Sequence, residues 1–324
     1  MIRIQNINKT FRVAKRQAGF HRAVMALFSR EYELVRALND ISFIIKDGEM
    51  VGYIGPNGAG KSTTIKIMCG ILTPDSGMCD IDGRIPWNER IAHVRRIGVV
   101  FGQRSQLWWD VPVIDSFELI RDIYKVDEKS YKNNLDELST LLDLGELLKT
   151  PARTLSLGQR MRCEIAASLL HNPRTLFLDE PTIGLDAVSK IAVRQFIKKQ
   201  NAERGTTVIL TTHDMQDIEA LTERILLIGK GRILLDGSLF ELRKRFSDRK
   251  TIVVEYSGAI PRLREGMTLV ESKEGQLNVA IDPAVISVSD AITNLASTTD
   301  LLDVSVSGVT AEEMVAAMYK EYHI

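Results

Sequence analysis

The sequence has few cysteines, no net charge and no long apolar run, and each absence narrows the classes of protein to consider. Its three cysteines, Cys69, Cys79 and Cys163, have no spacing typical of a metal site, so a reducing compartment suits the chain. Lys plus Arg and Asp plus Glu number 42 each, so the chain lacks the basic excess of nucleic-acid-binding proteins. We therefore expect no nucleic-acid partner.

The sequence also shows no stretch typical of a secretory signal or of a membrane-spanning helix. No apolar run approaches the roughly 18 residues of a membrane-spanning helix, and the first residues lack the apolar core of a secretory signal. We expect a cytosolic chain that would serve a membrane through partners. A chain of 324 residues is too long for one compact core of usual size, which predicts one large domain and a smaller one.

The sequence does contain a complete phosphate-binding loop, GPNGAGKST. It matches G-x-x-x-x-G-K-[ST] between an apolar stretch at 50–54 that predicts a strand and one at 64–69 that predicts a helix. Glycines let backbone amides approach a polyphosphate, and the positive end of the helix dipole faces it. Lys61 is expected to reach the outer phosphates and Ser62 to hold Mg²⁺. The candidate nucleotide-binding residues of the loop are Gly55, Pro56, Asn57, Gly58, Ala59, Gly60, Lys61, Ser62 and Thr63.

An acidic pair, Asp179 and Glu180, ends a predicted strand at 175–178. A carboxylate beside a phosphate loop can hold Mg²⁺ through water, and its neighbour can polarise an attacking water. Because adjacent strand residues point to opposite sides, the two are expected to have different roles. The predicted strand 207–211 brings His213 to the same sheet edge, where we expect it to contact the γ-phosphate.

Two further helical segments are predicted around these strands. The sequence LSLGQ, at 155–159, starts a helix with Ser156 as N-cap, and such a helix start is a second anion site. Together with the helical pattern over 113–149, it predicts a helical subdomain at about 113–172 inserted in an α/β core. A later helix is predicted with Val188, Ile191, Ala192 and Phe196 on one face, ending near Gly205.

Three segments leave alternatives open. The basic insert at about 12–34 can form an amphipathic helix on a membrane or partner, or it can cover the domain's own surface. Either Phe11 or Tyr32 can stack on a purine ring. Trp108 and Trp109 can pack inward or form a docking surface, and docking is favoured because adjacent side chains often cannot face the same core.

Taken together, the motifs resemble the ATP-binding cassette (ABC) family of transporter ATPase subunits over residues 1 to about 240. Five elements occur in the family's order: GPNGAGKST, Gln103, LSLGQ, LFLDE and His213. The resemblance implies an α/β P-loop NTPase cassette at 1–246, with a RecA-like core, an antiparallel β subdomain and a helical signature subdomain. A small C-terminal α+β domain at 247–324 is predicted to follow, as a dimer-contact or regulatory module without catalytic spacing.

The resemblance also implies ligands and catalytic roles. ATP and Mg²⁺ are the expected ligands, with Lys61 on the phosphates and with Ser62, Gln103 and Asp179 at the metal. Glu180 is expected to act as general base. His213 is expected to sense the γ-phosphate, and Gln103 to connect the metal to the loop that meets the membrane subunit.

A dimer follows from the same resemblance. In the family, two cassettes bind head to tail, as a homodimer or pseudo-dimer, and hold ATP between one phosphate loop and the other subunit's signature helix. Ser156, Gly158 and Gln159 are then expected at the opposite ATP and Asp186 at the dimer contact. Leu157 departs from the family's usual glycine, and leucine does not freely take positive φ. We nevertheless expect activity to survive.

Permease subunits in separate chains are the remaining partners that the resemblance implies. They are expected to dock near Arg104–Pro112, which includes the tryptophan pair, and to hold the chain at the cytoplasmic face of the membrane. The likeness is to bacterial exporter ATPases suspected of moving drugs or other small amphipathic molecules.

Overall fold

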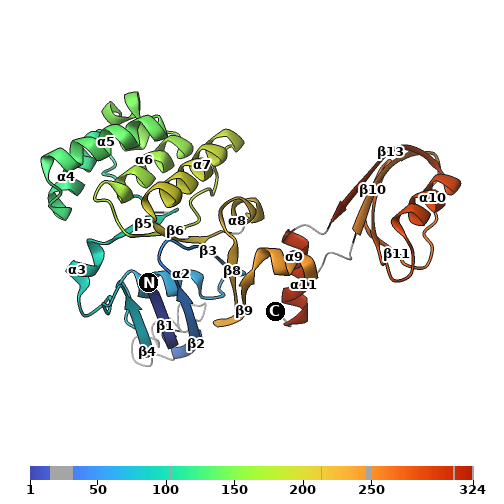
Figure 1. Ribbon diagram of the computed structural model, residues 1–324, viewed down its shortest axis with the longest axis horizontal. Helices are drawn as coiled ribbons and strands as arrows, with labels where there is room; N and C mark the ends of the chain where they lie inside the picture. The colour runs from blue at the N-terminus through green and yellow to red at the C-terminus, as the bar shows by residue number, and fades with distance from the viewer. Residues whose placement is uncertain (15–31, 103, 213, 246–249, 309–310, 323–324) are drawn as a thin grey trace, which may run out of the picture. The chain divides into compact units, whose positions relative to one another are not determined.

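The computed structural model describes residues 1–14, 32–102, 104–212, 214–245, 250–308 and 311–322. The chain divides into two compact units, Met1–Asp236 and Gly237–Ile324. Each unit has its own cluster of buried apolar side chains. Figure 1 shows the order of the elements along the chain.

A six-stranded sheet forms the centre of the first unit, in the order β5-β6-β7-β3-β8-β9. Its pairs from β5 to β8 are parallel, which brings their carboxyl ends to one edge. Strands β6, β7 and β3 are almost wholly buried, as apolar parallel strands covered on both faces are. The strands are β3 (Met50–Ile54), β5 (Ile97–Phe101), β6 (Thr175–Asp179), β7 (Thr207–Thr211), β8 (Arg224–Gly229) and β9 (Arg232–Ser238).

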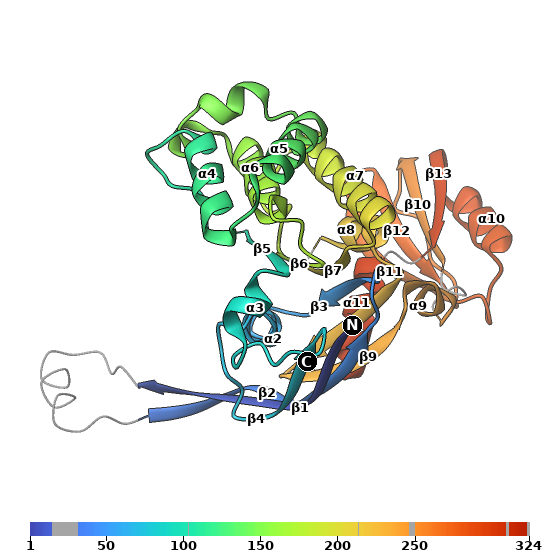
Figure 2. The same ribbon diagram turned by 60° about the vertical axis from the view of Figure 1, so that its left-hand side comes forward.

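A second, antiparallel sheet of the first unit contains β1 (Ile2–Ala14), β2 (Tyr32–Ile45) and β4 (Ser76–Ile81), in the order β2-β1-β4. Helix α2 (Lys61–Met68) contacts β2 and β4 on one side and β6 on the other, so it lies between the two sheets. Figure 2 shows this arrangement, with the helices between residues 113 and 204 on the far side of the larger sheet.

The predicted helical subdomain is present beside the larger sheet. Asp127 caps α5 by accepting a hydrogen bond from the Ser130 amide, and Lys125 and Asp143 end α4 and α5 with left-handed backbone. Besides α2, the helices described in the first unit are α3 (Arg90–Val94), α4 (Val113–Tyr124), α5 (Glu128–Leu142), η1 (Gly145–Lys149), η2 (Ala152–Thr154), α6 (Leu157–Leu169), α7 (Ala187–Arg204) and α8 (Met215–Leu221).

The second unit contains a four-stranded antiparallel sheet in the order β11-β12-β10-β13. Alternate residues of β10, such as Ile252 and Val254, pack against Leu295 of α10 in one apolar core. The elements of this part of the chain are α9 (Leu239–Arg245), β10 (Lys250–Ser257), β11 (Met267–Lys273), β12 (Gln276–Ile281), α10 (Val288–Thr298), β13 (Asp300–Gly308) and α11 (Ala311–Glu321).

Two sequence predictions about local structure are wrong. The ends of the predicted insert at 12–34 belong to the β1–β2 ladder, where Arg12 pairs with Leu34 and Ala14 with Tyr32, because backbone pairing continues past Phe11. Residues 15–31 of that insert lie outside the described residues. On α7, Val188 and Ile191 are 77% and 52% exposed, whereas the buried face consists of Val193, Phe196, Ile197 and Gln200.

Candidate functional site

The phosphate loop joins β3 to α2 at the carboxyl edge of the larger sheet. Gly60 has φ of +113° and caps α2. A Cβ atom on Gly60 would lie 2.7 Å from the Ala37 carbonyl oxygen, and one on Gly55 would lie 2.5 Å from the Ile228 carbonyl oxygen. Both positions therefore require glycine, because the loop is pressed against backbone on two sides.

Lys61 begins α2 and is only 8% exposed. Its Nζ donates hydrogen bonds to the carbonyl oxygens of Gly55 at 2.6 Å and Pro56 at 3.2 Å. Burial lowers the pKa of the Lys61 ammonium, and the negative charges of Glu180 and Asp179 oppose this shift. The loop thus holds the Lys61 ammonium against its own carbonyl oxygens.

The acidic pair lies close enough to Lys61 to stabilise its charge. Asp179 ends β6 and accepts a hydrogen bond from the Thr211 hydroxyl, and the Glu180 amide donates to the Thr211 carbonyl oxygen at 2.9 Å. Glu180 has φ of +55°, so the chain leaves the strand at this residue. The expectation that the two residues face opposite sides is therefore wrong, because both line the same cavity.

That cavity has a volume of about 810 Å³. Lys66 and Arg104 add basic side chains that sequence reasoning missed. Lys66 follows Ser62 by four residues on α2, and this helical spacing is a signal that could have revealed it. The lining residues are Gly55, Pro56, Asn57, Ser62, Lys66, Ile71, Phe101, Gly102, Arg104, Asp179, Glu180 and Ile183.

Two of the predicted site residues, Gln103 and His213, lie outside the described residues. The residues next to them in the chain are described. Gly102 is bonded to the end of β6, and Asp214 to the residue that follows β7. The Gly102 amide donates to the Asp179 carbonyl oxygen at 2.8 Å, and the Asp214 amide donates to the Thr212 hydroxyl at 2.9 Å.

The signature segment forms the predicted helix start with a reciprocal capping box. The Gln159 amide donates to Ser156 Oγ at 3.2 Å, and the Ser156 amide donates to Gln159 Oε1 at 2.9 Å. Leu157 is the first residue of α6 and does not take positive φ, so the departure from glycine causes no backbone strain here.

The signature helix packs closely against the start of α7. A Cβ atom on Gly158 would lie 2.7 Å from Ser189 Oγ, which itself donates to Asp186 Oδ2 at 2.8 Å. Asp186 caps α7 and also accepts from the Ser189 amide. Ser156, Gln159 and Asp186, here called the signature surface, are exposed or partly exposed, whereas Gly158 between them is buried. None of the four is among the residues that line the cavity.

The tryptophan pair follows β5 and faces outward. Trp108 is 58% and Trp109 50% exposed, so the alternative that both pack inward is wrong, and Leu107 takes the buried position. The Trp108 amide donates to Ser116 Oγ at 3.0 Å, and the Arg160 guanidinium lies 5.5 Å from the centre of the Trp109 ring.

A buried glutamate on α6 holds the segment that leads to these tryptophans. Glu164 accepts hydrogen bonds from the Ser105 hydroxyl and, at 3.1 Å, from the Gln106 amide. Burial raises the pKa of the Glu164 carboxyl, although these hydrogen bonds oppose the shift. The exposed rings therefore stand on a segment that is fastened to the signature helix.

Comparison with known proteins places this arrangement in a family. A family model described as ABC transporter matches residues 38–183. The linearmycin resistance ATP-binding protein LnrL of Bacillus subtilis is 34% identical over 218 residues, which cover 67% of this chain and 70% of that protein. The daunorubicin resistance ATP-binding protein DrrA3 of Streptomyces coeruleorubidus is 32% identical over 232 residues, 71% of this chain and 73% of that protein.

A solved structure gives the same result for the fold. The dimeric ATP-binding cassette MJ0796, in a post-hydrolysis state bound to ADP and Pi, matches with a TM-score of 0.62 and 27% identity, over 74% of this chain and 99% of that chain. The chain belongs to the ABC transporter family, as an ATP-binding subunit with an ATPase cassette. The predicted family and cassette fold are confirmed.

Proposed function

We propose that this chain uses ATP hydrolysis to power the export of a small amphipathic, drug-like molecule through permease subunits that are separate chains. The observation that carries the proposal is the cavity that brings the phosphate loop, Asp179 and Glu180 together. Two relatives are named as resistance proteins for linearmycin and daunorubicin, which favours export. No helix among the described residues combines the length and apolar character needed to cross a membrane. We infer a position at the cytoplasmic face of the membrane.

Hydrolysis at this site assigns separate tasks to Lys61, which begins the helix after the phosphate loop, and to the two carboxylates that line the cavity. Lys61 binds the outer phosphates in exchange for its present bonds to loop carbonyl oxygens. Glu180 accepts a proton from the attacking water. Asp179, whose carboxylate is held by the Thr211 hydroxyl, stays beside the phosphates. Two residues outside the described part, Gln103 and His213, are proposed at the metal and the γ-phosphate.

The residues of the cavity fit a Mg²⁺ ion that arrives with ATP. Ser62 and Asp179 both line it and supply a hydroxyl and a carboxylate oxygen. Mg²⁺ in such sites is held by one or two protein oxygens with phosphate oxygens and water. When bound, the ion would neutralise charge on the phosphates.

The base of ATP requires an aromatic partner near the loop, and the strand register favours Phe11. Ala37 lies against Gly60, and Phe11 pairs with Val35, two residues or about 7 Å along the strand. Tyr32 is five residues or about 17 Å from Ala37. We therefore propose Phe11 as the stacking residue.

In a dimer of two such subunits, the signature surface of one subunit would contact the ATP bound by the other. Ser156, Gly158 and Gln159 start a helix whose amides suit an anion, and they lie beside Asp186 rather than in the cavity of their own chain. The related cassette MJ0796 is dimeric. We propose that two head-to-tail subunits enclose two ATP molecules between phosphate loops and signature helices.

The permease is proposed to dock on the Arg104–Pro112 segment. Two large exposed aromatic side chains on a fastened segment are typical anchors of an interface. Movement of the signature helix would reach them through Glu164 and Arg160.

A pull-down of the tagged chain in mild detergent tests the docking and the transport role together. We expect wild type to recover proteins with several membrane spans, and a Trp108→Ala, Trp109→Ala variant to lose them. Ile91→Ala is the control, because Ile91 is equally apolar, 77% exposed and on α3. Recovery of ribosomal or DNA-repair proteins without a membrane protein would contradict the proposal. So would full recovery of the permease by the double variant.

A further inference from the structure

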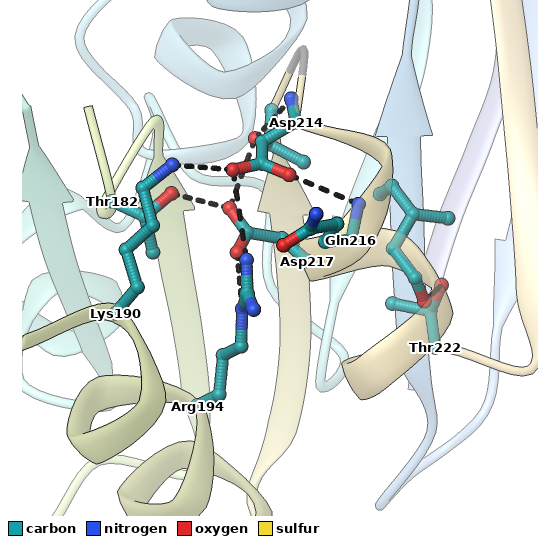
Figure 3. Close-up of polar contacts among 9 residues, drawn as sticks. Thr182, Lys190, Arg194, Asp214, Gln216, Asp217 and Thr222 are labelled. Carbon is teal, nitrogen blue, oxygen red and sulfur yellow. Dashed lines mark hydrogen bonds and ion pairs between the residues drawn. The ribbon is translucent and has the colours of Figure 1, made fainter. Parts of the chain in front are cut away.

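Asp217, a buried carboxylate of α8, lies where three segments of the cassette meet (Figure 3). Its side chain is 0% exposed. Asp217 Oδ1 accepts a hydrogen bond from Arg194 Nε at 2.6 Å. Oδ2 accepts from the hydroxyl of Thr182 and from that of Thr212 at 3.2 Å. The three donors come from α7, from the segment after β6 and from the segment after β7.

Each of these segments leads to a residue of the proposed reaction. Thr182 is two residues beyond Glu180, and Thr212 directly precedes position 213. Arg194 belongs to α7, whose N-cap is Asp186. One carboxylate therefore joins the glutamate segment, the segment around position 213 and the helix that leads to the signature surface.

A second carboxylate, Asp214, also binds α7. It accepts a hydrogen bond from Lys190 Nζ at 2.5 Å and lies 3.6 Å from Arg194 Nη2. Lys190 and Arg194 are four residues apart on α7, so both face α8. Burial would raise the pKa of the Asp214 carboxyl, but the hydrogen bond and charge of Lys190 outweigh it and the pKa is lowered. Both carboxylates thus meet a cation on the same helix.

The chemistry of the buried ion pair between Asp217 and Arg194 argues for a positioning role rather than for stability alone. A buried ion pair contributes little to stability compared with apolar residues of similar volume, because its desolvation offsets its attraction. What it does supply is restricted geometry, since a buried carboxylate that accepts three hydrogen bonds limits the positions of all three donors. Two of the donors, Thr182 and Thr212, are short side chains on connecting segments, so their backbone positions are restricted with them.

We propose that Asp217 is a positioning residue for ATP hydrolysis, which holds the Glu180 segment, the segment around position 213 and α7 in one relative arrangement. This inference rests on the proposed role of Glu180. The hydrogen bonds of Asp217 go to Thr182, Arg194 and Thr212, and none of these residues belongs to the phosphate loop. Nucleotide binding should therefore depend on Asp217 much less than the hydrolytic step does.

The test is steady-state ATPase kinetics of the full chain with Asp217→Asn. This change keeps the shape of the side chain but removes the charge and turns one acceptor into a donor. We expect kcat to fall by about 10- to 100-fold, as misplacement of a reacting group does, while KM for ATP changes by less than about threefold. Asp217→Glu, which restores the charge, should recover part of kcat.

Glu49→Gln is the matched control. Glu49 forms an ion pair with Arg224 at 2.9 Å just before β3, at the opposite end of that strand from the phosphate loop. It should keep the wild-type kcat. A wild-type kcat for Asp217→Asn, or a raised KM with kcat unchanged, would overturn the positioning role.

A second variant covers the case in which Asp217→Asn does not fold. Thr182→Val keeps the volume, leaves the Asp217–Arg194 pair intact and removes one donor, and kcat should fall with binding of ATP preserved. Unchanged kcat in this variant would overturn the proposal. Glu180→Gln separates the two ideas. If Glu180→Gln abolishes hydrolysis while Asp217→Asn does not affect it, the positioning role is wrong. If Glu180→Gln hydrolyses ATP normally, the proposed role of Glu180 is wrong.

Discussion

Lys61, Glu164 and Asp217 are buried charged side chains of the first unit, whereas the buried side chains described in the second unit are apolar except for Asn294. Burying a charge is costly unless partners and hydrogen bonds compensate for it. The first unit provides such partners at each position, on loop carbonyls, on the segment before the tryptophans and on α7. The contrast shows that the buried charges of the first unit join separate segments through hydrogen bonds, while the second unit is built by apolar packing.

The largest expected effect comes from the acidic pair of the first unit. Glu180→Gln keeps the shape of the side chain but removes the proposed base, so kcat should fall by about 10² to 10⁴. ATP should still bind, and an ATP-bound dimer should accumulate in size measurements with ATP and Mg²⁺. Glu203→Gln, an exposed carboxylate near the end of α7, is the control. A monomeric Glu180→Gln chain with normal hydrolysis would count against the mechanism.

A core substitution in the second unit should lower stability and leave ATPase activity unchanged. Leu295 is fully buried between α10 and the sheet, so Leu295→Ala should lower the free energy of unfolding of this unit by about 2 to 5 kcal/mol. Denaturant unfolding measures the loss, and Leu302→Ala, exposed on β13, should have little effect. ATPase activity at a temperature where both units are folded should not change. A parallel loss of kcat would show that the two units are not functionally separate.

The smallest effect expected is a pH dependence of the folding stability of the first unit. Burial lowers the pKa of His171 to about 4, and its ring stacks on Tyr124 while Nε2 contacts the Ile97 carbonyl oxygen at 2.9 Å. The unfolded chain binds a proton near pH 6.5 and the folded chain does not, so stability should fall as pH drops from 6.5 to about 4. His171 should account for at most about 3 kcal/mol of this loss.

Urea unfolding at pH 7 and pH 5 measures this effect. His171→Gln should flatten the difference between the two pH values, with His93, whose pKa burial also lowers, providing the remaining acid sensitivity. An equally steep pH dependence in the variant would exclude His171 as its source.

Local pattern predicted much of the fold because the signals were strong and short in range. The strands 50–54 and 207–211 have the predicted bounds, and Ser156 caps its helix as its side chain chemistry requires. Periodicity failed on α7, where Val188 and Ile191 are exposed. Apolar spacing shows that a helix has a face, but the neighbours that cover one face are supplied by distant segments.

The candidate site was predictable to the extent that its residues belong to contiguous motifs. Lys61, Asp179 and Glu180 come from such motifs, and the parallel sheet brings them to one edge. Arg104 and Asp217 belong to no motif of that kind. Their roles depend on which strands are neighbours in the sheet, which no short stretch of sequence encodes.

The sequence by itself determined the phosphate loop, the acidic strand end and the signature helix, because glycine conformations, carboxylate chemistry and helix capping act within a few residues. Only the tertiary structure decided that Asp179 and Glu180 share a cavity, that the tryptophans face outward and that Asp217 joins three segments. The physical reason is that these outcomes depend on positive φ at one residue and on contacts between segments far apart in the chain.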